Sequence, residues 1–277
     1  IKETLVSTSN DVVTVYYDIT SISIERGCET TSTVSVDLYP DITINSSKNV
    51  TLCSGEALDY TITTDIAPSI PLMYEWSRPE VEGILEPENS GNNNRITETL
   101  TNITDSPKVV SYTLTATYEF TYTDTSGRSA RDACDEVTQL DVVVYPTAEI
   151  SSSLLETICN GGDFSYTLNS TTPGVTYNWT ADYPPYITTN ASNSGTNVIS
   201  GNFSHDFDYD VTVNFTLTAQ ANGCEPASKI LQLVIPPKPK LLNSITEQTI
   251  CSEDIFIFIP TLNESTTVFS WNRPAVT

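Results

Sequence analysis

The three tryptophans of this chain lie in copies of one short pattern. Each lies two positions after an aromatic residue, and each follows a cysteine by 20 to 23 residues. The pairs are Cys53 with Trp76, Cys159 with Trp179, and Cys251 with Trp271. A pattern that recurs with a period of about 100 residues indicates a tandem array of small domains. The function of such a chain has to be inferred from the whole array.

The later part of each copy also recurs. Residues 13–20 match 109–116 and 211–219, and each stretch is followed by a turn, a cysteine and a segment that ends in proline. Residues 1–5 match 96–100, so we expect the chain to start in the middle of a repeat. Proline cannot continue a central strand, so these prolines are natural domain boundaries. The expected parts are the second half of a first repeat, complete second and third repeats, and the first part of a fourth: 1–40, 41–146, 147–237 and 238–277.

Short β-prone segments make up most of the chain. Sixteen prolines interrupt it, and no segment combines helical spacing of apolar residues with capping signals. Short strands with a tryptophan in mid-domain are typical of an immunoglobulin-like β-sandwich. We therefore expect an all-β rod of tandem sandwiches with Trp76, Trp179 and Trp271 in successive cores. In the third repeat the expected strands lie near 147–152, 163–169, 175–180, 186–190, 196–201, 211–219 and 225–235.

The charge balance excludes several kinds of partner. The chain has 35 acidic and 12 basic residues, which gives a net charge of −23. Nucleic-acid binders need a basic surface, and anionic membranes would repel this chain, so we expect neither partner. No stretch reaches the ~18 apolar residues of a membrane span. Six cysteines, two per complete repeat and none in a metal-ligand spacing, indicate an oxidising, extracytoplasmic compartment.

Several motifs together resemble a known family. They are Cys-Ser-Gly at 53–55, Tyr-x-Trp-x-Arg-Pro at 74–79, Glu-Thr-Leu-Thr-Asn-x-Thr at 98–104, Tyr-Thr-Leu-Thr-Ala at 112–116 and Asn-Gly-Cys at 222–224. This set resembles the PKD-like, immunoglobulin-like repeats of Bacteroidetes surface proteins. The resemblance implies a large secreted adhesin, similar to the gliding-motility adhesin, that is exported by type IX secretion to the bacterial cell surface. Asn160 and Glu253 depart from the Cys-Ser-Gly motif.

The six cysteines allow three regular pairing schemes. Each complete repeat has an early cysteine, which precedes its tryptophan, and a late cysteine, which follows the recurring stretch near the end of the repeat. A disulfide needs Cα atoms within about 7 Å. We expect the early and late cysteines of one repeat at opposite ends of the sandwich, and six residues of strand already span ~20 Å. This distance argues against pairing within a repeat. Pairing across a junction places the cysteines farther apart still. The schemes that stay open are Cys53–Cys134 with Cys159–Cys224 (within a repeat); Cys28–Cys53, Cys134–Cys159 and Cys224–Cys251 (across junctions); and early to next late, as in Cys53–Cys224.

The second repeat carries extra residues before its late cysteine. Tyr112 lies 22 residues before Cys134, whereas the corresponding distances in the other repeats are 9 and 11 residues. We expect a longer hairpin that projects toward the first repeat. Its aromatic residues alternate and share one face. They form either a strut that packs on the first repeat or an exposed ledge for a ligand such as a glycan: Tyr118, Phe120 and Tyr122.

An acidic cluster in the third repeat is a second candidate site. Asp206, Asp208 and Asp210 offer the hard oxygens that calcium prefers, although the glycine and distal glutamate of an EF-hand loop are absent. The other interpretation is that strand alternation places these acids in solvent. The adjacent His205 is the only histidine, so no histidine-based catalytic device can recur across the repeats. No catalytic motif is present, and we expect no enzymatic activity.

These observations favour a structural role. We expect a stalk or spacer segment of a large surface adhesin or filament, with neighbouring repeats of the same chain as its main partners. The alternative is a binding module for carbohydrate or calcium, which would use the extra hairpin or the acidic loop and could also bind other envelope proteins. We expect no cofactor apart from possible calcium.

Overall fold

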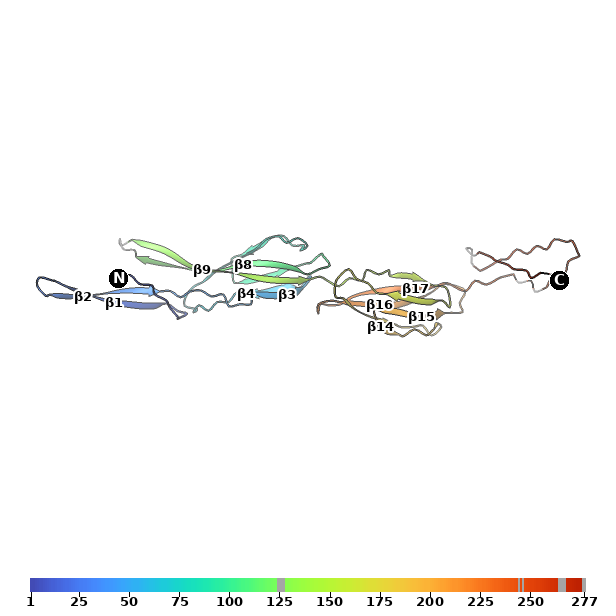
Figure 1. Cartoon of the computed structure of the whole chain (residues 1–277), viewed down its shortest axis with the longest axis horizontal. Coiled ribbons are helices and arrows are strands. Elements are labelled where there is room, and N and C mark those ends of the chain that lie inside the picture. The colour runs from blue at the N-terminus through green and yellow to red at the C-terminus, as the bar shows by residue number, and fades with distance from the viewer. Residues whose placement is uncertain (124–127, 244, 246, 264–267, 276–277) are drawn as a thin grey trace. The chain divides into compact units, whose positions relative to one another are not determined.

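The computed structural model describes residues 1–123, 128–243, 245, 247–263 and 268–275. The regular elements of this described part are the strands β1 to β17, and no helix occurs among them (Figure 1). Within the same residues, no helix is long and apolar enough to cross a membrane. The chain divides into two compact units, Ile1–Thr147 and Ala148–Thr277, which are described separately below.

The N-terminal unit begins with a two-stranded sheet. Strands β1 (Val13–Ile22) and β2 (Glu29–Leu38) pair antiparallel with Tyr17 opposite Val34. Valine, isoleucine and tyrosine alternate with polar residues along both strands, which is the period-2 pattern of a sheet with one apolar face. A turn at Gly27, whose φ of 66° suits glycine, closes this hairpin.

The second repeat is a sandwich of two sheets. In one sheet β3 pairs parallel with β9, and β8, β5 and β6 follow in antiparallel pairs, which gives the immunoglobulin-like order β3-β9-β8-β5-β6. In the other sheet β4 pairs antiparallel with β7. The strands are β3 (Asn49–Cys53), β4 (Ala57–Thr61), β5 (Met73–Arg78), β6 (Asn89–Gly91), β7 (Arg95–Thr99), β8 (Lys108–Thr123) and β9 (Ser129–Tyr145). The core lies between the sheets, where every second residue of β8 from Val110 to Tyr118 is at most 1% exposed.

The third repeat forms the same sandwich inside the C-terminal unit. Its sheets have the orders β10-β17-β16-β12-β14 and β11-β15-β13, again with a parallel first pair. Its core is mainly apolar, with Ile199, Phe203 and Phe215 at 0% exposure, although the polar Thr172 and His205 are buried as well. The strands are β10 (Leu155–Thr157), β11 (Asp163–Thr167), β12 (Thr176–Ala181), β13 (Thr188–Thr189), β14 (Ser194–Thr196), β15 (Val198–Ser204), β16 (Val211–Gln220) and β17 (Ala227–Ile235).

The expected tandem immunoglobulin-like β-sandwiches are confirmed. The strands of the third repeat differ from the prediction at two main places: the first strand is 155–157 and not 147–152, and the predicted strand 196–201 is divided into β14 and β15. Ala148 and Ile150 are nevertheless buried at 2% exposure each. Apolar residues at these two positions therefore mark a segment that packs on the core without joining a sheet.

Residues 238–277 form no strand in their described part, apart from an isolated bridge between Leu241 and Leu262. Trp271 is 89% exposed, so the prediction that it fills a core is wrong in this structure. The physical reason is that no described sheet of this segment is available to cover its indole ring. The division of the chain into 1–40, 41–146, 147–237 and 238–277 stays a prediction.

Candidate functional site

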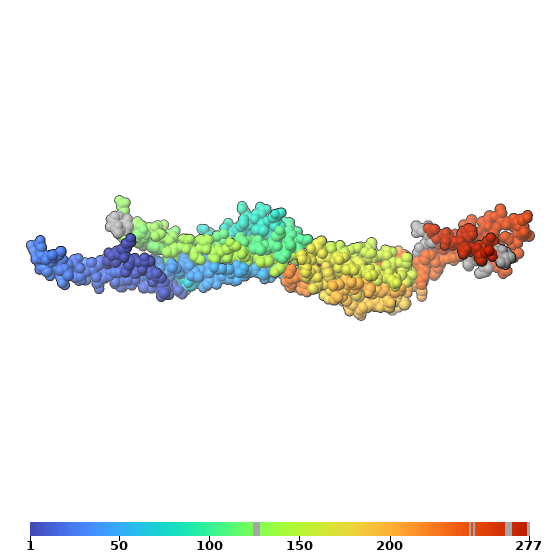
Figure 2. Space-filling view, in the orientation of Figure 1, coloured from blue at the N-terminus to red at the C-terminus, as the bar shows by residue number. Residues whose placement is uncertain are grey.

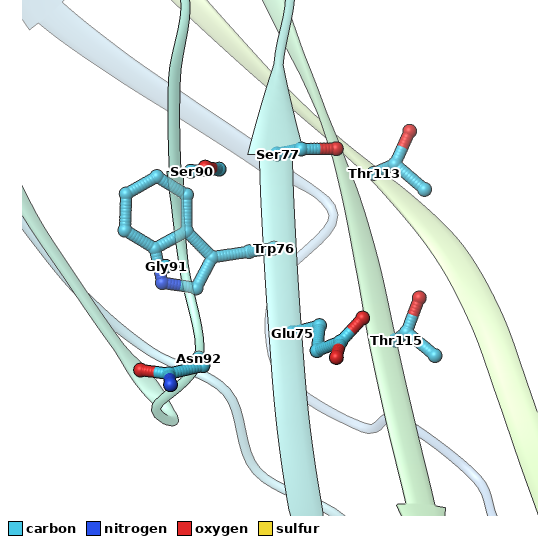
Figure 3. Close-up of a pocket in the computed structure, with 8 residues that line it drawn as sticks. All are labelled: Glu75, Trp76, Ser77, Ser90, Gly91, Asn92, Thr113 and Thr115. Carbon is cyan, nitrogen blue, oxygen red and sulfur yellow. The ribbon is translucent and has the colours of Figure 1, made fainter.

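The tryptophans of both complete repeats lie over a glycine of a neighbouring strand. Trp76 is 7% and Trp179 is 3% exposed. Gly91 of β6 lies opposite Trp76, and a Cβ there would come within 2.6 Å of the indole ring (Figure 3). Gly195 holds the same place under Trp179, at 2.9 Å. Both tryptophans are therefore core residues, as predicted, and both glycines are needed for the close approach of ring and backbone.

The hydrogen bonding of the two indole groups differs. Trp179 Nε1 donates to the carbonyl oxygens of Thr196 and Val198, at 3.1 Å each. Trp76 Nε1 is buried without a hydrogen-bond partner in the described structure. The hollow beside it has a volume of about 520 Å³ and is lined by polar side chains of β5 and β8, including the exposed Glu75 and the half-buried Thr115 (Figure 3). This shallow polar surface contains no catalytic grouping.

The strongest electrostatic feature is a buried ion pair in the second repeat. Arg78 of β5 donates to both carboxylate oxygens of Glu98 in β7, through Nε at 2.9 Å and Nη2 at 2.8 Å. Their side chains are 1% and 9% exposed. The hydroxyl of Tyr112 in β8 and the amide of Asn89 also donate to Glu98. This set of residues is the Arg78–Glu98–Tyr112 cluster, and it links three strands across the two sheets.

The pKa values of the cluster follow from this geometry. Burial alone would raise the pKa of Glu98, but the hydrogen bonds from Arg78, Tyr112 and Asn89 outweigh it, and the pKa is lowered. Burial, together with the Glu98 carboxylate, raises the pKa of Tyr112 well above its ordinary value. Glu98 is therefore a buried carboxylate and Tyr112 a neutral donor at physiological pH. Every strong group is satisfied by another, so the cluster is built for stability.

The third repeat replaces the whole cluster with apolar residues. Register places Ala181, Gly201 and Phe215 at the positions of Arg78, Glu98 and Tyr112. Aromatic rings fill the space, since Phe215 packs against Phe164, Trp179, Tyr183 and Phe203. Losing one partner of a buried pair is costly, whereas replacing all partners together can be neutral. The two repeats thus hold their sheets together by alternative means.

The only histidine of the sequence is held in place by hydrogen bonds to the backbone. His205 is 4% exposed; its Nδ1 accepts from the Phe207 amide, so Nε2 carries the proton and donates to the Ile235 carbonyl at 2.9 Å. Asn102 does the same in the second repeat, where its amide donates to the Val144 carbonyl at 2.9 Å and its oxygen accepts from the Thr104 amide. His205 and Asn102 are thus equivalent corner residues.

The neighbours of these two corner residues are equivalent as well. Asn160 exchanges two hydrogen bonds with the backbone of His205, and Ser54 exchanges two with the backbone of Asn102. The departure of Asn160 from the Cys-Ser-Gly motif therefore preserves its function at the corner. Asn102, although it begins an Asn-x-Thr sequence, is 6% exposed and engaged by these bonds.

The extra hairpin of the second repeat has the expected length and a mixed environment. Strands β8 and β9 have 16 and 17 residues, against 10 and 9 in β16 and β17. Of the two interpretations, the contacts of Tyr118 fit the strut and not the ledge, since Tyr118 is buried at 1% exposure and its hydroxyl donates to the Pro40 carbonyl at 2.5 Å. Phe120 stacks on Tyr39 with 4.4 Å between ring centroids. Phe120 is half-buried, and Tyr122, at 46% exposure, is the most accessible of the three.

A groove of about 760 Å³ lies between this hairpin and the end of β2. Figure 2 shows the two segments in green and blue within the N-terminal unit. Tyr39 and Phe120 form one wall, and Tyr122 and Asp132 lie farther along the hairpin. The sequence gives no sign of the role of Tyr39, because Tyr39-Pro40 has the same form as Tyr145-Pro146 at the end of the second repeat and indicates only the end of a strand.

The acidic residues of the third repeat do not form a metal centre. Among the described residues, no group of three potential metal ligands is close enough to hold an ion. Asp208 Oδ1 instead accepts from Lys240 Nζ at 2.6 Å, in an exposed ion pair. Asp206, Asp208 and Asp210 are therefore not brought together as calcium ligands.

The cysteines distinguish between the pairing schemes. Cys53 and Cys224 are disulfide-bonded. Four cysteines are free, namely Cys28, Cys134, Cys159 and Cys251. Pairing within a repeat and pairing across a junction are both wrong here, because each requires a free cysteine to be bonded. The early-to-next-late scheme joins Cys53 and Cys224, the two residues that are bonded.

Solved structures similar to this chain have low sequence identity to it. Three of them share 10–13% identity with this chain. They are domains 1–5 of Sidekick-1 (13% identity, TM-score 0.36, 82% of this chain and 48% of that one), insect hemolin (10%, 0.34, 80% and 56%), and the human desmocollin-1 ectodomain (13%, 0.32, 85% and 46%). At these TM-scores the likenesses add nothing to the assignment.

No curated protein matches the chain. The model of the PKD-like domain matches residues 50–130 and 156–239, which is more than half of the chain. The first matched range covers the sandwich of the second repeat up to the start of β9, and the second covers that of the third repeat; both tryptophans and both corner residues lie within them. The chain therefore belongs to the PKD-like domain family.

Proposed function

We propose that this chain is a non-catalytic structural segment of a large extracellular protein, in which PKD-like sandwiches act as spacers. The observation that carries the proposal is how the polar groups of the second repeat are used. Arg78, Glu98, Tyr112 and Asn102 are the buried groups that could serve chemistry, and each is engaged by another part of the sandwich. Such groups stabilise a fold, and these four are not free to act on a substrate.

Repetition supports the same role. Two sandwiches keep one strand order, one tryptophan–glycine contact and one corner, although their core chemistry differs. A spacer requires only that each repeat stays folded, so its interior can change as long as the fold is kept. The net charge of −23 keeps an exposed chain soluble.

We further propose that the parent protein is an adhesin at a bacterial cell surface, with a role in adhesion or gliding motility and export by type IX secretion. The support is the resemblance of the repeat motifs to those of Bacteroidetes surface proteins. Its partners would be neighbouring repeats and, at the surface, glycans or other envelope proteins. The bonded Cys53 and Cys224 support an oxidising compartment outside the cytoplasm.

One observation favours a second candidate function, which is glycan binding at the groove beside the extra hairpin. Tyr39, Phe120 and Tyr122 form a row of rings, and Asp37 and Asp132 supply acceptors beside it. Exposed aromatic faces next to carboxylates can stack on sugars and accept their hydroxyl hydrogen bonds. The third repeat lacks this longer hairpin.

A glycan array probed with the 277-residue chain separates the two functions. The spacer proposal expects no binding above background, and an unchanged melting temperature when a chelator is added. Binding that Tyr122→Ala removes would favour the second candidate. Tyr209→Ala is the matched control, because Tyr209 is an exposed tyrosine of the third repeat. If both variants still bind glycan, the glycan site is not the groove and the chain is not only a spacer.

A further inference from the structure

Two asparagines of the sequence are followed directly by glycine, and both lie in the third repeat. They are Asn160, in the turn after Cys159, and Asn222, in the turn between β16 and β17. Both glycines have positive φ, 87° at Gly161 and 77° at Gly223. The two sites therefore share one dipeptide and a similar glycine conformation, and they differ in the contacts that surround them.

An asparagine that precedes glycine can lose its side-chain amide without an enzyme. The peptide nitrogen of the glycine forms a bond to Cγ of the asparagine, the bond from Cγ to Nδ2 breaks, and ammonia leaves with the proton of the peptide nitrogen. Water then adds to either carbonyl carbon of the cyclic imide and opens it to aspartate or isoaspartate. Glycine permits this attack most readily, because no Cβ crowds the reacting nitrogen. The reaction requires a free side-chain amide and a free glycine N–H.

Hydrogen bonds occupy all the reacting groups at Asn160. Its Nδ2 donates to the His205 carbonyl at 2.9 Å, and its Oδ1 accepts from the His205 amide at 3.1 Å. The Gly161 amide, which would be the attacking group, donates to the Phe203 carbonyl at 2.8 Å. Attack on Asn160 therefore requires these three bonds to open first.

Asn222 lies at the tip of a hairpin, where its reacting groups are free. Asn222 and Gly223 are both exposed, and their φ values of 55° and 77° suit a tight two-residue turn. Among the residues that the structure describes, none forms a hydrogen bond with the Asn222 side chain or with the Gly223 amide. Buried residues anchor the turn on each side, Ala221 at 3% and Cys224 at 4% exposure. No hydrogen bond has to open before Gly223 attacks Asn222.

We propose that Asn222 is a site of spontaneous deamidation in the folded protein and that the corner of the sandwich protects Asn160 from the same reaction. The reaction consumes water and releases ammonia, so it needs no enzyme, oxidant or reductant. Each hydrogen bond that must open makes the reactive state of Asn160 rarer. Asn222 should therefore be modified at least about tenfold faster than Asn160.

The modification changes the turn beside the disulfide-bonded Cys224. The Cys224 amide donates to the Ala221 carbonyl at 3.0 Å across this turn. Isoaspartate lengthens the main chain by one methylene group and adds a carboxylate, whereas the geometry of a two-residue turn depends on its length. The hydrogen bond from Cys224 to Ala221 should therefore weaken, and hydrogen exchange of the Cys224 amide should become faster.

The test is incubation of the 277-residue chain in mildly alkaline buffer, which favours loss of the peptide proton. Mass spectrometry of proteolytic peptides follows the mass gain that accompanies replacement of an amide by a carboxylate. In the folded protein the gain at Asn222 should be at least about tenfold faster than the gain at Asn160. In concentrated urea with a reductant the two rates should become similar, because both asparagines precede glycine and neither keeps its contacts.

Asn222→Gln is the control for the effect on the turn, because the longer glutamine side chain forms the corresponding ring far more slowly. After the same incubation this variant should show neither the mass gain at residue 222 nor faster exchange of the Cys224 amide. Faster exchange in the incubated variant, or unchanged exchange in the modified wild type, contradicts the predicted effect on the turn.

A folded protein that stays unmodified at Asn222 overturns the proposal, as do equal rates at the two asparagines in the folded protein. A rate difference that persists in urea also contradicts it, because the flanking sequence and not the fold would then be the cause. These outcomes leave the spacer role untouched, because that role does not depend on the chemistry of Asn222.

Discussion

Arg78 and Glu98 meet inside the second repeat through two hydrogen bonds of 2.9 and 2.8 Å, with side chains 1% and 9% exposed. Ala181 and Gly201 hold these positions in the third repeat. One PKD-like fold thus holds its sheets together with a buried ion pair in one copy and with aromatic rings in the next. The difference leads to the first prediction.

Arg78→Ala should destabilise the second repeat by about 3–5 kcal/mol, because it leaves the Glu98 carboxylate buried without its cation. Arg95→Ala is the control, since Arg95 pairs with Asp59 in a bridge whose side chains are 59% and 57% exposed. Such an exposed pair contributes only about 0–1 kcal/mol. Hydrogen exchange of the β8 amides measures the effect on this repeat alone. Equal losses in the two variants would contradict the importance of burial.

The stability of the second repeat should fall in acid because of Glu98. Its folded-state pKa is lowered by Arg78, Tyr112 and Asn89 in spite of burial. A carboxyl group whose pKa is lowered in the folded state stabilises the fold at pH values above its unfolded-state pKa of about 4.3. This stabilisation is lost as the pH falls through the folded-state pKa. The stability gap between wild type and Glu98→Gln should therefore be largest near neutral pH and shrink below about pH 4. Urea unfolding of both proteins across this range is the measurement, and a gap that grows in acid is the contrary result.

Gly91→Ala should destabilise the second repeat by about 1–3 kcal/mol, because the new methyl group overlaps the Trp76 ring. Its Cβ would lie 2.6 Å from the indole. Ser90→Ala, at the adjacent exposed position of β6, should have little effect. Trp76 fluorescence during denaturation reports both changes when Trp179 and Trp271 are both replaced by Phe in the background. A Gly91→Ala protein as stable as wild type would show that the ring does not rest on this glycine.

The equivalence of His205 and Asn102 predicts a conservative exchange. His205→Ala removes the donor to the Ile235 carbonyl and should cost about 1–3 kcal/mol. His205→Asn should recover part of this loss, because an asparagine already performs both hydrogen bonds at the corresponding corner. Thermal unfolding of the two variants provides the comparison. If Asn restores nothing, the two corners are not interchangeable.

The repeat, the all-β sandwich and the buried Trp76 and Trp179 could be predicted from sequence, because local alternation and a fixed period determine them. The alignment was wrong by one position in the first repeat, where matching residues 13–20 to 109–116 equated Tyr16 with Tyr112. The bond from Tyr17 to Glu3 shows that Tyr17 is the true equivalent. The spacing of 11 residues to Cys28 is also counted from Tyr17, so two comparisons within the sequence disagree by one position, and strand register decides between them.

The candidate sites were less predictable, since alternation assigns a face without stating what covers it. Tyr118 was placed correctly on a shared face, but Pro40 and Tyr39 cover it from a part of the chain far away in sequence. The Arg78–Glu98–Tyr112 cluster was missed because its members lie on three strands. Its signal was present in the joint occurrence of Trp-x-Arg-Pro and a glutamate 14 residues before a tyrosine.

The most direct test of the spacer account is the extension of single chains pulled from their ends, with and without a reductant. A spacer segment has to resist extension, and a bond between Cys53 and Cys224 prevents the residues between them from extending. Reduction should therefore lengthen the fully extended chain by about 600 Å, which is about 170 residues at ~3.5 Å each. Cys224→Ser should show the longer extension in both conditions. Equal extension of the wild type with and without reductant would contradict the account.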